Sequence, residues 1–169
     1  MRTAVWGIVG WLGLCISTAV GFNLGWGYLM PDIPVIVTVF VAMRREPIPM
    51  ALCAVGLGYL VGRQAGLPTG VGESGMLLCG LVVYRMTGHF AGRDLFFASV
   101  CGGAAIGLQL AIFGLLYTGR GVAAFASDAA AFLVPGGFLT AVVALLLYRP
   151  MLRLDGRLQT ARREGLSWS

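Results

Sequence analysis

The sequence contains no lysine, a single histidine (His89) and no pair of cysteines separated by only a few residues. Structural metal sites are built from several cysteine and histidine ligands at short, regular spacing, so we expect no metal centre in this chain. The cysteines fall singly in different apolar segments, where a cysteine behaves as a small apolar side chain. They are Cys15, Cys53, Cys79 and Cys101.

Charged residues are also scarce, at 11% of the 169 residues, whereas 58% of the chain is hydrophobic. Soluble domains carry about 25% charged residues, so a water-soluble core does not account for this composition. The composition predicts an integral membrane protein whose spans use nearly all of the chain. We expect a transmembrane domain over residues 1–148 and a basic cytoplasmic tail over residues 149–169.

Groups for catalysis are missing as well. A hydrolase needs a nucleophile beside a base, and a metalloenzyme needs clustered ligands. Ser99 has no histidine near it in the sequence, and no HExxH motif occurs. The acidic residues are predicted to lie at the ends of spans or in loops; they include Asp32, Glu46, Glu73, Asp94, Asp128 and Asp155. The sequence therefore predicts a protein that is not an enzyme and has no cofactor.

The chain is rich in apolar segments that could cross a membrane. We place them at about residues 4–29, 33–43, 48–62, 75–90, 95–117 and 129–148. The first is longer than the roughly 7–15 apolar residues of a secretory signal, so we predict an uncleaved span. The second covers only ~17 Å at 1.5 Å per residue. It crosses the membrane only if Arg44 and Arg45 snorkel or the bilayer thins, and a re-entrant segment is the alternative.

The distribution of the arginines along the chain favours a full membrane crossing by residues 33–43. The net charge is +5, and every basic residue other than the histidine is an arginine placed beside an apolar segment, which indicates membrane topology rather than nucleic-acid binding. With six spans and a cytoplasmic N-terminus, all arginines except Arg63 and Arg120 face the cytoplasm. The sequence thus predicts an all-α integral membrane bundle of six short transmembrane helices with both termini cytoplasmic.

Glycines four residues apart run through residues 51–72, which we take as the segment around which the chain is organised. Gly58 and Gly62 lie one helical turn apart, where a missing side chain lets another backbone approach closely. Gly66 and Gly70 lie beside a proline and are predicted to be turn residues. Pairs at the same spacing in the first and fifth spans are predicted to contact other helices of the chain or of a partner: Gly21 with Gly25, and Gly103 with Gly107.

Other residues mark the ends and the interior of the spans. Trp6 is expected at the membrane interface, and Asn23 is expected to form an interhelical hydrogen bond. Pro31 breaks the first helix, and Asp32 is predicted to cap the second. The Pro-Gly-Gly sequence at residues 135–137 should kink or break the last span, which follows a polar connector at residues 118–128 whose Ala-rich middle could extend a helix.

The tail is basic and partly amphipathic, because leucines and Met151 alternate with its arginines. This pattern is typical of a segment that lies on an anionic membrane surface. We expect anionic lipid at the cytoplasmic face to contact Arg149, Arg153, Arg157, Arg162 and Arg163.

The order of these features resembles that of the bacterial rod shape-determining membrane protein MreD family. The family shows a proline–polar pair after the first span, which Pro31 and Asp32 match, and then a short apolar run like residues 35–43. A glycine-rich helix with a glycine-spaced turn follows, which GLGYLVGRQAGLPTG at positions 56–70 resembles. The likeness in layout covers residues 1–155, and its specific part is residues 31–70. Gly62 departs from the pattern, since the family commonly has an aspartate there.

The resemblance implies a multi-pass protein of the bacterial inner (cytoplasmic) membrane without catalytic activity. Such a protein is a scaffold subunit of the cell-shape and peptidoglycan elongation machinery and acts by helix–helix contacts with membrane partners. The partners implied are the bitopic protein MreC and, through it, the actin-like MreB and the cell-wall synthase complex. The alternative is the substrate-binding membrane subunit of a small-molecule (vitamin-type) transporter, which has a similar hydropathy layout.

Overall fold

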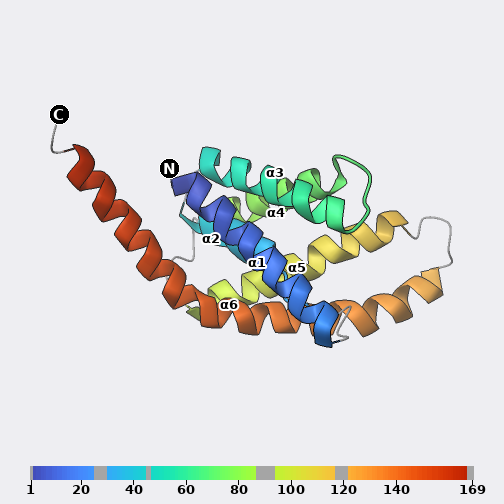
Figure 1. Ribbon diagram of the computed structural model, residues 1–169. Helices are drawn as coiled ribbons and strands as arrows, with labels where there is room; N and C mark the ends of the chain where they lie inside the picture. Colours follow the sequence, from blue (N-terminus) through green and yellow to red (C-terminus); the bar gives the residue numbers. More distant parts are fainter. Residues whose placement is uncertain (1, 25–29, 45–46, 87–93, 117–121, 167–169) are drawn as a thin grey trace.

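The computed structural model is all-α, and Figure 1 shows its helices. It describes residues 2–24, 30–44, 47–86, 94–116 and 122–166, and the side chains of residues 3–23, 30–44, 47–86, 94–112 and 133–158. The helices in these ranges are α1 (Arg2–Leu24), α2 (Ile33–Met43), α3 (Pro47–Gln64), α4 (Val71–Met86), α5 (Asp94–Leu116) and α6 (Val122–Leu166). The prediction of an all-α chain with six helices is therefore confirmed for the part of the chain that the structure describes.

Successive helices run back and forth between the two ends of the bundle, inclined to one another (Figure 1). The start of α1 and the end of α6 consequently lie at the same end of the bundle, which we call the N/C end. Three segments are long and apolar enough to cross a membrane: Thr3–Asn23, Asp94–Ile112 and Leu133–Leu158. These three segments indicate a multi-pass membrane protein.

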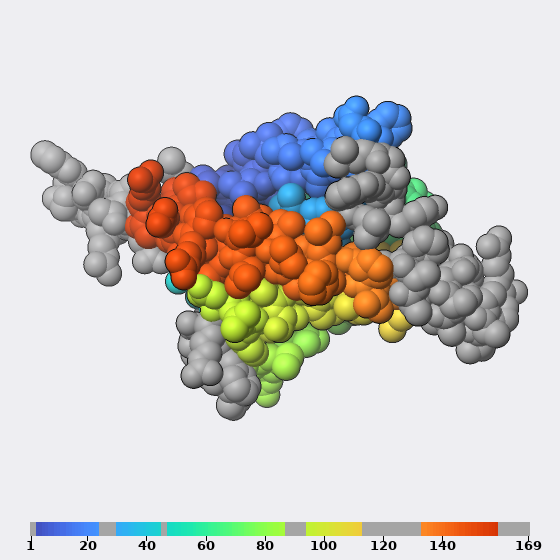
Figure 2. Space-filling view, turned by 90° about the horizontal axis from the view of Figure 1, so that it is seen from below, coloured from blue at the N-terminus to red at the C-terminus, as the bar shows by residue number. Residues whose placement is uncertain are grey.

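The short helix α2 lies at the centre of the bundle. Its residues from Pro34 to Ala42 are all buried, and it contacts each of the other five helices. Figure 2 shows α2 only as a small patch between α1 and α6. The chain is thus organised around residues 33–43, and the expectation that residues 51–72 hold this place is wrong. Glycine spacing marks where two helices meet, whereas burial on every face marks the centre.

The composition of α2 would favour a strand in water, because Val35–Val39 contains four β-branched aliphatic residues and one threonine. In an apolar environment a helix satisfies every backbone group within the segment, and this requirement outweighs strand propensity. Pro34 lies in the first turn, where its missing N–H costs no helical hydrogen bond. The helix bounds agree with the expected residues 33–43.

The turn between α3 and α4 ends one helix and starts the next within six residues, 65–70. Gly66 has φ +66°, Leu67 N–H donates to Gly62 O at 2.9 Å, and Gly66 N–H donates to Arg63 O at 3.4 Å. This pattern is a Schellman cap, which favours glycine at the left-handed position. Gly70 has φ +95°, and its N–H donates to Glu73 Oε2 at 2.9 Å. The predicted turn role of both glycines is confirmed.

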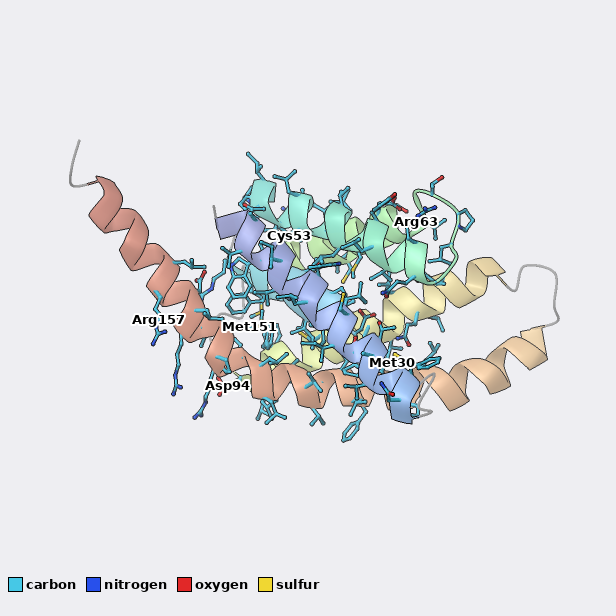
Figure 3. The ribbon with its side chains drawn as sticks, in the orientation of Figure 1. Met30, Cys53, Arg63, Asp94, Met151 and Arg157 are labelled. Carbon is cyan, nitrogen blue, oxygen red and sulfur yellow. The ribbon has the colours of Figure 1, made fainter. Side chains whose placement is uncertain are left out.

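Among the helices, α6 differs most from its predicted bounds and its predicted break. It begins at Val122, inside the predicted connector, and continues through Pro135 and Pro150 to Leu166. The Pro-Gly-Gly sequence therefore does not break the helix. Figure 1 shows α6 changing direction in its C-terminal part, and Figure 3 places Met151 near this bend, where Pro150 removes a backbone donor. The helix is continuous across the expected boundary between the membrane domain and the tail.

Candidate functional site

The closest approach between helices in the described residues joins α3 and α4 through glycines. A Cβ added at Gly58 would lie 2.5 Å from Gly72 O and 2.8 Å from Glu73 Cα, and one added at Gly72 would meet Gly58 O. Gly62 lies on the same face, and its Cβ would be 3.6 Å from Gly72 Cα. The two backbones are thus in direct contact. The structure agrees with the predicted packing role of Gly58 and Gly62 and supplies Gly72 as their partner.

A second contact of this kind joins α5 and α6. A Cβ at Gly102 would lie 3.0 Å from Gly137 O, and one at Gly137 would lie 3.2 Å from Gly102 O. Gly137 belongs to the sequence that was expected to kink or break the helix, and instead it admits α5 closely. Both contacts let small residues bring backbones together, which is the main device of helix association in membranes.

The predicted pair Gly103 and Gly107 lies on a different face of α5. A Cβ at either position would meet nothing within 4 Å, so neither glycine packs against another helix of the described chain. Both residues are exposed and line an apolar groove of about 470 Å³ between α4 and α5. The role predicted for them in packing within the chain is therefore taken by Gly102, one residue earlier, which points about 100° away around the helix. Contact with a partner remains a prediction for this pair.

Gly21 packs against a loop residue rather than against a helix. A Cβ added at Gly21 would meet the side chain of Met30, which Figure 3 places beside the end of α1. Met30 directly precedes the Pro31–Asp32 pair, so this contact holds the start of that described link against α1. Gly25, the other member of the predicted pair, lies outside the described residues.

Four aromatic side chains from different helices form a row inside the N/C end of the bundle. The ring centroids are 4.9 Å apart for Trp6 and Phe40, 6.1 Å for Phe40 and Phe97, and 4.8 Å for Phe97 and Tyr148. The row joins α1, α2, α5 and α6, and contacts of this geometry stabilise beyond the area they bury. Trp6 is 2% exposed. Its ring therefore faces the interior of the bundle, where it packs on Phe40, and its depth at the membrane interface stays a prediction.

An ion pair closes the same end. Arg44 Nε lies 3.2 Å from Asp155 Oδ2, and its guanidinium carbon lies 5.1 Å from the centroid of the Phe40 ring. The Asp155 side chain is 1% exposed. The sequence placed this acid in a tail that lies on the membrane surface, and that placement is wrong. Arg44 does not simply snorkel: it bridges the end of α2 to α6 and sits on an aromatic face, an arrangement that suits a planar guanidinium.

Exposed arginines gather at the N/C end. Figure 3 places Arg157 and Asp94 there and Arg63 towards the opposite end. Arg149, Arg153 and Arg157 are exposed, and Arg149 Nε lies 3.4 Å from Asp94 Oδ2 in a solvent-accessible pair. The arginine face predicted for the tail is present over these residues. Arg162 and Arg163 lie in the last part of α6, and their side chains are outside those that the structure describes.

Pro31 and Asp32 lie in the short link before α2. Asp32 occupies the N-cap position; its side chain does not meet the full geometry of a capping hydrogen bond, but the Val35 N–H, three residues on, acts on its carboxylate as a cap would. Its backbone N–H instead donates to Thr140 Oγ1 on α6 at 3.0 Å. Burial raises the pKa of the Asp32 carboxyl group to about 6, although the interaction with the Val35 N–H lowers it. The link is thus anchored to α6 through the backbone.

Asn23 and Gln109, the polar residues predicted inside the spans, do not share either of two grooves in the described residues. Asn23 Nδ2 donates to Ala19 O at 2.8 Å, so its hydrogen bond within the described residues stays inside α1 and is not the expected interhelical one. Gln109 lines neither the groove between α4 and α5 nor a second groove of about 470 Å³ between α1 and α3. The second groove is lined mainly by apolar residues and glycines, among them Gly7 and Gly56.

Sequence reasoning missed Gly72, Gly102, Gly137 and the Arg44–Asp155 pair. A usable signal existed for Gly102, because Ala98 and Ala105 repeat with it at helical spacing and form one buried row of small residues. No comparable signal existed for the ion pair, whose members are separated by more than one hundred positions.

Comparison of the chain with known protein families, with curated proteins and with solved structures finds no match.

Proposed function

We propose that this protein is a non-catalytic scaffold subunit of the bacterial cell-shape and peptidoglycan elongation machinery, acting by helix–helix contacts with membrane partners. The observation that carries the proposal is the filled centre of the bundle. Nine consecutive residues of α2, from Pro34 to Ala42, are buried where a solute-binding subunit would need a polar cavity. Binding sites for polar solutes need polar groups near the middle of the membrane.

The outer surface supports the same proposal. Large apolar side chains are exposed in a row along α3 at Ile48, Leu52, Val55 and Tyr59, with the i, i+4, i+7, i+11 spacing of one helix face. In a membrane such a face contacts lipid or another transmembrane helix. The resemblance of residues 31–70 to the MreD family names the partners to test, which are MreC and, through it, MreB and the cell-wall synthase complex.

The topology proposed with this function has six spans and both termini in the cytoplasm. It is supported by the antiparallel order of the helices and by the arginines at the N/C end. We expect a cysteine introduced at Gly70, in the exposed α3–α4 turn, to react with an impermeant thiol reagent in whole cells lacking the native cysteines. A cysteine at Arg153 should stay unlabelled until the membrane is permeabilised. The reverse labelling would eliminate this topology.

The scaffold proposal predicts that single polar groups in the spans are dispensable. Cells of the source bacterium that lack the gene should lose their rod shape, and a copy with Gln109→Leu should restore it fully. Crosslinking followed by purification from membranes should capture a bitopic membrane protein with both the wild-type chain and this variant. Normal shape in the deletion strain, together with lost uptake of a small molecule in Gln109→Leu cells, would support the transporter subunit instead.

A further inference from the structure

The groove between α4 and α5 has a lining without a charged or hydrogen-bonding side chain other than the thiol of Cys79. Its space is open beside Gly103 and Gly107, where a Cβ would meet nothing within 4 Å, and Ala104 and Ala111 are further small residues of the lining. Water is not retained in a site of this kind, since each water needs two to four polar partners. The groove therefore requires an apolar occupant.

The dimensions of the groove distinguish between two apolar occupants. Its lining runs along α4 from Gly75 to Met86, a distance of ~16 Å at 1.5 Å per residue. This is about half of a hydrocarbon core ~30 Å thick, or one leaflet. A helix about 10 Å wide would occupy roughly 1,300 Å³ over that length, whereas the groove holds about 470 Å³. A single acyl chain fits within the space, whereas a transmembrane helix would lay only one face against this open groove.

The charge at one end of the groove indicates the kind of lipid. Arg85 is exposed in the last turn of α4, next to Met86 of the lining. Helix α4 ends at the N/C end of the bundle, where Asp94 and Arg157 also lie (Figures 1 and 3). Asp94, at the start of α5, pairs with Arg149. A guanidinium at the membrane surface favours a lipid phosphate over a neutral headgroup.

We propose that the α4–α5 groove holds one acyl chain of an anionic phospholipid from the leaflet at the N/C end, with its phosphate on Arg85. In the proposed topology this is the cytoplasmic leaflet. Open glycines at Gly103 and Gly107 then serve to admit the chain, which explains why neither contacts another helix of the described bundle. The site needs no protein partner, so it stands or falls independently of the scaffold function.

The test uses the purified full chain, freed of lipid in mild detergent, and phosphatidylglycerol or phosphatidylethanolamine with identical acyl chains. Native mass spectrometry should show one retained phosphatidylglycerol per chain. Gly103→Leu fills open space, so the chain should fold normally and retain at least tenfold less of either lipid. Arg85→Gln should reduce the preference for phosphatidylglycerol about fivefold, the change that one basic residue near the surface provides. Gly56→Leu, and Arg63→Gln at the end of the bundle opposite the N/C end, are the matched controls and should retain lipid as the wild type does.

A second measurement needs no variant. Phosphatidylglycerol with a photoactivatable group in the acyl chain should label wild-type α4 and α5, including residues near Cys79 and Ala104. Labels confined to other helices would overturn the proposal, and so would equal lipid retention by the wild type and Gly103→Leu. If Gly103→Leu retained lipid but no longer captured a membrane protein in cells, the groove would belong to a partner helix and the lipid assignment would be wrong.

Discussion

Replacing Gly58 with alanine is expected to lower the free energy of unfolding by about 3 kcal/mol. The new Cβ would lie 2.5 Å from a backbone oxygen and 2.8 Å from a backbone carbon of α4. Neither atom belongs to a side chain that can rotate away, so α3 and α4 must separate along their contact. Reversible unfolding of the purified chain in mixed detergent–dodecyl sulfate micelles measures the loss.

Gly56 provides the matched control, because it lies in the same helix and a Cβ there meets nothing within 4 Å. Gly56→Ala should change the unfolding free energy by less than about 1 kcal/mol, in the stabilising direction that helix propensity predicts. The double variant Gly58→Ala/Gly72→Ala should be less destabilised than the sum of its single variants, since one separation of the helices relieves both clashes. Unchanged stability of Gly58→Ala would show that the two backbones are not in contact.

The sequence predicts the helices of this protein well because their boundaries depend on local chemistry. Pro34 in the first turn, the glycine of the Schellman cap at Gly66 and the arginine at the end of α2 each act on their own neighbours. The sequence leaves the start of α6 open, because alanines in the expected connector continue a helix as readily as they form a loop; the structure has the helical alternative from Val122.

The faces of the helices are harder to predict. In a soluble protein the buried face is apolar and the other is polar, but in a membrane both faces are apolar. The apolarity of α5 therefore does not distinguish Gly102, which meets α6, from Gly103, which faces the groove; only the spacing of Gly102 with Ala98 and Ala105 does. For the same reason, the apolarity of both faces, the sequence does not show that α2 is central. Its short length predicts a marginal span, whereas in the structure it is that of a buried core helix.

Charged pairs are hidden for another reason. Arg44 and Asp155 were each assigned to a membrane surface because single charged residues beside apolar segments are usually found there. Their pairing depends on the continuation of α6 past Tyr148 and on its bend near Met151 (Figure 3). Only the three-dimensional path of α6 brings the carboxylate against the end of α2.

Loss of the cation from this pair is the second large effect that we expect. Arg44→Ala should lower the unfolding free energy by about 2 kcal/mol, because it removes a charged partner from a buried carboxylate. This loss of unfolding free energy is smaller than that expected for a fully buried ion pair, since 32% of the Arg44 side chain is exposed and screened by solvent. Arg149→Ala is the control. Its pair with Asp94 is exposed on both sides, so its loss should cost less than about 0.5 kcal/mol.

A double variant separates the charge from the packing. Arg44→Met/Asp155→Leu removes both charges and keeps apolar volume, so it should recover most of the stability that Arg44→Ala loses. Hydrogen exchange of the backbone amides at residues 151–158 supplies a local readout, because the pair holds this part of α6 against α2. Arg44→Ala should speed their exchange while leaving α3 and α4 unaffected. Equal exchange in Arg44→Ala and the wild type would mean that the aromatic row, from Trp6 to Tyr148, holds α6 in place without the ion pair.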